Sequence, residues 1–307
     1  MKFNFKTLGL AAAGLVGVLL LVVVLFIVFF PKELAAREAE KRIEEATGRQ
    51  LTLGQHVEVS FWPALGFSVD GVSLSNPEGF PTDEPFIAAE RLVFAVKVMP
   101  LLAGRIEVKE LIFDGAALNL EARADGAANW AFPTEQSAPE QEFTIEDLRL
   151  DDVRLNHGRI RFNGGDGGEP MLLENVDVRL ALQSLDQPAQ IVAALDYRGE
   201  RLEIESAIGL PRAVLEQGET PIAASVRSAL LNASVEGAFN ATTGAMSGKL
   251  EADGRSLRDL LAWIGSPLGE GGGFGAFRVS SQLAHEGPRT ALNELSCAST
   301  PSMRAET

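Results

Sequence analysis

Two pairs of adjacent carboxylates are candidates for acid–base chemistry in this chain. Glu146 and Asp147 form one pair, and Asp151 and Asp152 form another. General acid–base catalysis needs carboxylates that converge on one pocket, whereas neighbours on a strand point to opposite faces. A solvated strand edge or turn therefore explains both pairs better than catalysis does.

Two glycine-rich segments resemble phosphate-binding or nucleotide-binding loops. The run 164–168, GGDGG, lacks the lysine of a P-loop and the repeated aspartates of an EF-hand. Gly271, Gly273 and Ala276 fit G-x-G-x-x-A, but they follow a predicted helix and precede a predicted strand. This is the reverse of the dinucleotide-binding order. We interpret the first segment as a hairpin turn and reject the second as a nucleotide motif.

Metal-binding and nucleophile patterns are also missing from the sequence. His56, His157 and His285 lie far apart without metal-ligand spacing, and no G-x-S-x-G motif occurs. The single cysteine, Cys297, excludes an intrachain disulfide. We therefore expect a protein that is not an enzyme and uses no metal or other cofactor. The formal net charge of −15 argues against a nucleic-acid partner, because such a surface repels phosphates.

The uncharged apolar run from Leu8 to Phe30 is the dominant element of the sequence. A bilayer core needs roughly 20 such residues as a helix. A cleaved signal peptide is the alternative, but its apolar core of about 7–15 residues ends in small residues, whereas this run ends in Phe29-Phe30-Pro31. We predict a cytoplasmic tip and single-pass transmembrane anchor over residues 1–30. The short basic N-terminus favours an N-terminus inside and the bulk outside.

Small residues recur on one face of the predicted anchor. Gly9, Ala13 and Gly17 are spaced by four, which would let a second membrane helix approach closely. Residues 31–50 then predict a short solvated helix, with Pro31 in its first turn and Gly48 as its C-cap.

From Leu51 onward the pattern changes to period-two alternation, which indicates strands. We predict a mainly β fold with an antiparallel sheet and few helices. Its expected parts are a first β module over 51–132, a linker over 133–142, and a continued sheet over 143–296 with a helix near 256–264. Residues 297–307 lose the alternation and are predicted to be an aberrant or disordered tail.

Alternation places apolar residues on one face within each strand. Alone, it allows either the dry core of a sandwich or the floor of a trough. The positions chosen as candidates for this face are Val57, Val59, Leu92, Phe94, Val96, Leu118 and Leu120.

The segment from Phe61 to Phe132 resembles the signature of the AsmA family. The matching positions are Pro63, Gly66, Asn76, Pro77, Gly79, Phe80, Pro100, Leu101, Gly104, Gly115, Gly126, Asn129 and Trp130. The later segment from Leu257 to Phe277 is similar to the middle region of the family. Family members are usually longer, so we also expect a truncated chain.

This resemblance implies an inner-membrane protein of a Gram-negative envelope with its bulk in the periplasm. It implies a chorein-like N-terminal module and an elongated, curved β trough, as in bridge-like lipid transfer proteins. The trough would carry phospholipid towards the outer membrane, with the seven candidate residues as lining. The expected partners are phospholipid, the inner membrane and envelope assembly proteins. The alternative is a non-catalytic scaffold for outer-membrane proteins that binds no lipid.

Overall fold

The computed structural model describes residues 41, 44–45, 47–54, 56–60, 62, 64–80, 84–102, 106–131, 148–164, 168–216, 218–269, 273–286 and 289–299. The predicted anchor with Gly9, Ala13 and Gly17 lies outside these residues, as do Pro63, Gly104 and the predicted linker. Within the described part of the chain, no helix has the length and hydropathy needed to cross a bilayer.

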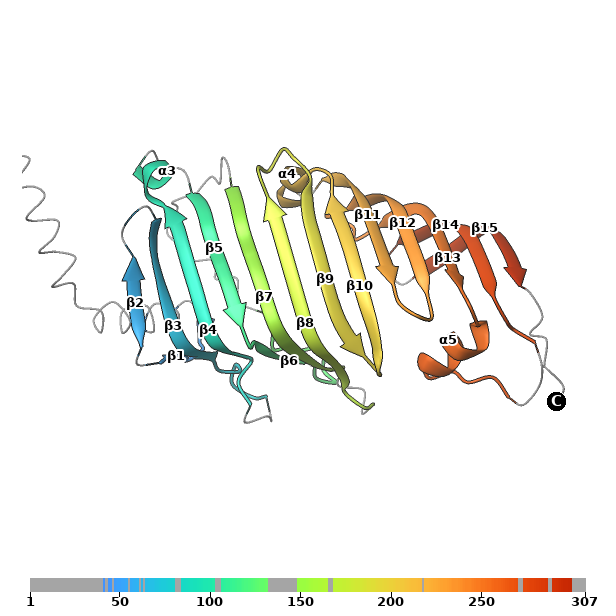
Figure 1. Ribbon diagram of the computed structural model, residues 1–307, viewed down its shortest axis with the longest axis horizontal. Helices are drawn as coiled ribbons and strands as arrows, with labels where there is room; N and C mark the ends of the chain where they lie inside the picture. Colours follow the sequence, from blue (N-terminus) through green and yellow to red (C-terminus); the bar gives the residue numbers. More distant parts are fainter. Residues whose placement is uncertain are drawn as a thin grey trace, which may run out of the picture.

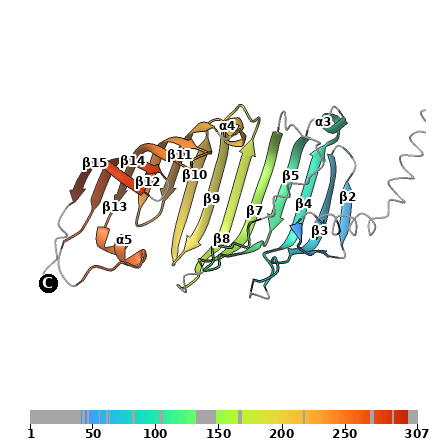
Figure 2. The ribbon, with the colours of Figure 1, turned by 180° about the vertical axis from the view of Figure 1, so that it is seen from behind.

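A single curved sheet of 15 strands makes up most of the described structure (Figure 1). Its strands are β1 (Leu51–Leu53), β2 (Val57–Ser60), β3 (Ala64–Leu74), β4 (Ile87–Lys97), β5 (Ile106–Asp114), β6 (Ala117–Glu121), β7 (Leu148–Asn163), β8 (Met171–Leu182), β9 (Ala189–Tyr197), β10 (Glu200–Ile208), β11 (Glu219–Arg227), β12 (Asn232–Asn240), β13 (Met246–Gly254), β14 (Phe277–Glu286) and β15 (Arg289–Ser299). The short helices α3 (Val98–Leu102), α4 (Pro211–Leu215) and α5 (Leu257–Trp263) lie at strand ends. Seen from both sides, the strands form one layer (Figure 2). The prediction of a mainly β fold with few helices is confirmed.

The prediction of an antiparallel sheet is wrong at one position. β5 and β6 lie end to end between β4 and β7, and β7 runs parallel to both. The parallel pairing starts at Ile106 with Leu148, so the chain must return to the same end of the sheet after β6. Parallel neighbours need such a long crossover connection, and alternation carries no information on strand direction.

The cross-strand register defines two faces of the sheet with different chemistry. Residues paired across neighbouring strands point to the same face. One row of paired residues from β2 to β14 is Val59, Phe67, Phe94, Leu111, Val153, Leu180, Ile191, Ser206, Ala224, Val235, Leu250 and Ser281. The adjacent row on the opposite face is Glu58, Ser68, Val93, Ile112, Arg154, Arg179, Val192, Glu205, Ser225, Ser234, Glu251 and Ser280. We call the face of the first row the apolar face and the other the polar face.

Irregular residues in the first half of the sheet keep apolar side chains on the apolar face. The row Val69, Leu92, Phe113, Leu155, Val178 and Ala193 is followed along the strands by the row Leu74, Ile87, Leu118, Ile160, Leu173 and Tyr197. The two rows are four residues apart in β9 but five apart from β3 to β8. In a regular strand, residues five apart point to opposite faces, so each of these strands must contain one extra residue, as in a β-bulge.

Positive backbone φ angles mark this line of bulges. The residues between the two rows with positive φ are Gly71, Gly115, His157 and Asn175. They lie in β3, between β5 and β6, in β7 and in β8. We call these four residues the bulge line. Because of it, Leu118 and Ile160 share a face with Phe94 instead of pointing to the polar face.

The helix α5 lies at the position predicted from the sequence. Ser256 is its N-cap, and its Oγ accepts a hydrogen bond from the main-chain N of Asp259 at 3.2 Å. At its other end, the Trp263 indole Nε1 donates to the Tyr197 carbonyl O at 3.2 Å, and the two rings pack edge to face. The connection between β13 and β14 is therefore fastened to the β9–β10 turn.

Of two boundaries predicted from the sequence, one agrees with the structure and the other does not. Gly48 has a φ of 67° and its N–H bonds to the Glu44 carbonyl, as expected for the C-cap of the helix before β1. The predicted tail, residues 297–307, begins too early, because β15 continues through Cys297 to Ser299 and pairs with β14. Main-chain ladder hydrogen bonds do not require alternating side chains.

The bulge line predicts an unusual sensitivity at Gly115. Its φ is 61°, and an added Cβ would lie 2.6 Å from Cδ of Glu90. We expect Gly115→Ala to lower the free energy of unfolding by about 1–3 kcal/mol, through positive-φ strain and displacement of Glu90. Urea denaturation of the purified chain measures this. Gly269→Ala is the control, since nothing lies within 4 Å of the added Cβ. Equal stability of the two variants would contradict the role of the bulge.

Candidate functional site

All seven residues predicted to line the site lie on the apolar face. Val57 pairs with Val69 and Val59 with Phe67, which places β2 on this face with Leu92, Phe94 and Val96 of β4. Leu118 pairs with Ile87 and Ile160, and Leu120 pairs with Phe162. The sequence predicted a shared face only for residues of the same strand. The register across the bulge line places the residues of different strands on one face.

The apolar face is shielded by neighbouring side chains but has no second layer. The rings of Phe67 and Phe94 are 5.7 Å apart and tilted by 45°. Phe67 is still 36% exposed and Leu65 is 39% exposed. No other sheet lies over this face in the described residues (Figures 1 and 2). The described residues therefore leave this apolar surface without a covering layer.

A small buried cluster supports one end of the apolar face. Leu182, Leu185 and Ala189 form this cluster at the β8–β9 connection. The half-buried residues packed against it are Leu148, Leu150, Leu180 and Ile208. The main-chain N of Arg212 in α4 donates to the Leu185 carbonyl at 2.9 Å, which attaches α4 to this cluster.

The polar face carries exposed ion pairs and open hollows. Arg227 pairs with Glu205, and Lys249 lies 2.6 Å from Glu251. A hollow of about 290 Å³ lies on this face over Gly66 and Ala95. Its lining combines these small residues with two ion pairs, Arg91–Glu58 at 3.8 Å and Lys109–Glu110 at 2.9 Å.

One of the two carboxylate pairs considered for catalysis takes part in ion pairs instead. Asp151 lies 2.6 Å from Lys97, and Asp152 pairs with Arg154. Glu146 and Asp147 lie outside the described residues. Within the described ranges, no group of three or more His, Cys, Asp and Glu side chains is arranged to hold a metal ion.

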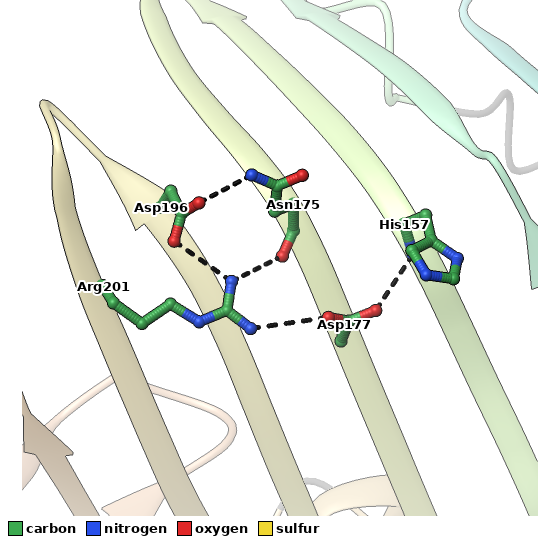
Figure 3. Close-up of polar contacts among 5 residues, drawn as sticks. All are labelled: His157, Asn175, Asp177, Asp196 and Arg201. Carbon is green, nitrogen blue, oxygen red and sulfur yellow. Dashed lines mark hydrogen bonds and ion pairs between the residues drawn. The ribbon is translucent and has the colours of Figure 1, made fainter.

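A polar cluster stabilises the bulges of β7 and β8 (Figure 3). Arg201 donates from Nη1 to the Asn175 carbonyl at 3.0 Å and to Oδ1 of Asp196 at 3.1 Å. Its Nη2 lies 3.5 Å from Oδ2 of Asp177, whose Oδ1 accepts from the main-chain N of His157 at 3.0 Å. The cluster therefore holds two positive-φ residues, His157 and Asn175, against β9 and β10.

Sequence reasoning missed this cluster. Its residues come from four strands and individually resemble ordinary surface positions. The available signal was the five-residue spacing between Leu173 and Val178, which breaks the period of two. A bulge is the simplest reason for such a break.

An asparagine network uses several positions of the family signature. Asn129 is fully buried, and its Nδ2 donates to Oδ1 of Asn76 at 2.8 Å and to the Asn119 carbonyl at 2.7 Å. Its Oδ1 accepts from the main-chain N of Glu121 at 2.8 Å. Asn76 in turn donates to the Glu84 carbonyl at 2.6 Å. The network connects the loop after β3 to the end of β6, which is a structural role.

The other described signature positions lie in turns, strands and aromatic contacts. Gly79 and Gly126 have positive φ, Trp130 packs on Phe162 with ring centroids 5.8 Å apart, and Arg123 lies 5.9 Å from the ring of Phe80. Gly66 is required because an added Cβ would lie 2.3 Å from the Phe94 carbonyl O. Pro77 follows Asn76 in the loop after β3, and Pro100 and Leu101 belong to α3.

Comparison with known proteins gave one match. The model of the AsmA family matches residues 5–270. No curated protein and no solved structure matches the chain.

The cluster around Arg201 predicts a specific pH dependence. Hydrogen bonds from Asn175 and then from Arg201 hold the pKa of Asp196 below its ordinary value of 3.8. A carboxylate with a lowered pKa stabilises the folded state above that ordinary value, and the contribution is lost as the pH falls through the lowered one. Arg201→Met should therefore destabilise the protein most above pH 4, with a difference from the wild type that shrinks on acidification.

Denaturant midpoints measured between pH 6 and pH 3 test this expectation. Arg227→Met is the matched control, because it removes an exposed arginine whose partners lie in β10 away from the bulge line. Its difference from the wild type should not follow the Asp196 titration. A pH-independent difference for Arg201→Met would contradict the assignment.

Proposed function

The chain belongs to the AsmA family, and on this basis we propose that it is a non-catalytic lipid-handling protein of the bacterial envelope. In this proposal a single span anchors it in the inner membrane with the sheet in the periplasm. The apolar face holds the acyl chains of phospholipid on their way towards the outer membrane. Phospholipid headgroups remain in water.

The continuous apolar face is the observation that carries this proposal. A large apolar surface left in water is unfavourable, and soluble proteins that keep one use it for binding. Acyl chains on this face would remove both surfaces from water, at about 0.8 kcal/mol for each buried CH₂ group. No charged groups are needed for such binding, which agrees with the uncharged side chains of the row from Val59 to Ser281.

The dimensions of the face also support lipid as the ligand. At about 4.8 Å between neighbouring strands, the row from β2 to β14 extends for roughly 50 Å. The hydrocarbon core of a bilayer is about 30 Å thick, so one leaflet contributes about half of that. The face therefore has room for more than one lipid in sequence, as movement along a trough requires.

Replacement of Phe94 tests the proposal. Phe94→Asp places a carboxylate in the apolar row, in the third strand counted from its β2 end, and desolvating it would cost several kcal/mol. We expect this variant to lose most of the phospholipid that copurifies with the wild type. Native mass spectrometry of the gently extracted chain counts the bound lipid. Val93→Asp is the control, because Val93 is the neighbouring residue on the polar face of the same strand.

The two variants keep the same N-terminal segment, so lipid bound there is equal in both. A folded Phe94→Asp protein with as much lipid as Val93→Asp would contradict the proposal. That outcome would favour the scaffold alternative, in which proteins cover the apolar face.

A further inference from the structure

Large apolar side chains are exposed at the end of the sheet that carries α3. Trp62 is 71% exposed, Met99 is 65% exposed and Leu65 is 39% exposed. Trp62 lies in the turn between β2 and β3, and Met99 lies in α3 between β4 and β5. We call these three residues the apolar tip.

The register of β3 and β4 places the two parts of the tip next to each other. Ala64 pairs with Lys97 and Leu65 pairs with Val96 at this end of the sheet. The turn containing Trp62 and the helix containing Met99 therefore extend from neighbouring strands in the same direction. Figure 1 shows α3 at the upper end of these strands.

The segments that form the tip carry no acidic residue. The sequence has 42 acidic residues, yet segments 59–69 and 92–104 contain none, and Lys97 is their one charged residue. Lys97 lies 2.6 Å from Asp151 and 3.3 Å from Glu107. Its charge is thus neutralised on the polar face at the base of the tip, and the tip itself is uncharged.

The tip is continuous with the apolar face. Leu65 pairs with Val96, the next pair on the same face is Phe67 with Phe94, and the one after is Val69 with Leu92. Between the exposed tip and the pair Val69–Leu92, halfway along β3 and β4, this face therefore carries no charged side chain.

We propose that the apolar tip inserts into the interface of a phospholipid bilayer and that acyl chains move between the bilayer and the apolar face over Leu65 and Val96. Tryptophan side chains favour the headgroup level of a bilayer, and leucine and methionine favour its acyl boundary. The absence of acidic residues from these segments removes the repulsion that anionic headgroups would exert on the rest of this acidic chain. This inference rests on the proposed function, for which it names the point of lipid entry.

Depth-dependent quenching in the full chain tests the insertion. Cys297→Ser removes the single cysteine, and Met99→Cys then carries an environment-sensitive fluorophore. The labelled chain is reconstituted into phospholipid vesicles with or without lipids that carry a quencher below the headgroup. We expect several-fold quenching of this label by the quencher lipid. The same label at Ala127→Cys, in an exposed turn at the other end of these strands, should not be quenched.

A second substitution excludes insertion driven by the fluorophore itself. Trp62→Ser in the labelled Met99→Cys protein should reduce the quenching at least twofold, because Trp62 shares the tip. No quenching at Met99→Cys, equal quenching at Ala127→Cys, or no effect of Trp62→Ser would overturn the proposal. A tip covered by a protein partner would give the first of these results.

The outcome is separate from that of the lipid-binding test. Quenching at the tip together with an apolar face free of lipid would contradict the proposed function and leave membrane insertion standing. Lipid on the apolar face without quenching at the tip would contradict membrane insertion and leave the proposed function standing. Trp62→Ser should also slow lipid uptake at least twofold without changing the retention of lipid already bound, and unchanged uptake would contradict entry at the tip.

Discussion

The register between β3 and β9 requires one extra residue in each strand from β3 to β8, and the chemistry of the whole sheet depends on it. Without the bulge line, Leu118, Ile160 and Leu173 would point to the polar face, and the apolar face would be divided into two short patches. Glycine allows the bulge at positions 71 and 115, where positive φ has no Cβ penalty. His157 and Asn175 adopt positive φ at a cost that the hydrogen bonds around Arg201 and Asp177 offset.

A single layer of strands with one apolar face differs energetically from a sandwich. In a sandwich, a second sheet covers the apolar face about 10 Å away. The described residues provide no such layer, so they leave part of the apolar face uncovered. Under the proposed function the covering layer is phospholipid, whose acyl chains would cover a long apolar surface while its headgroups stay in water. The apolar tip extends this surface to one end of the strands without an intervening charge.

Alternation predicted the strands, and it predicted which residues of one strand share a face, as Val57 does with Val59 and Leu92 with Phe94. It did not predict that Leu118 would share that face, because this depends on a bulge that period-two patterns do not describe. The parallel direction of β7 was missed because strand direction follows from the connection. The Arg201 cluster was missed because its members are distant in sequence and are brought together by β-pairing. The signature asparagines were recognised by resemblance, but their role became clear only from the burial of Asn129.

Site-specific photo-crosslinking in living cells tests the central claim most directly. A photoreactive amino acid would replace Phe94 or Leu173, which lie on the apolar face on opposite sides of the bulge line. The controls are the adjacent polar-face positions Val93 and Glu174. One continuous lipid-bearing face predicts phospholipid adducts at Phe94 and Leu173 and none at Val93 and Glu174. Protein adducts alone at Phe94 and Leu173, or no difference between the two faces, would contradict it.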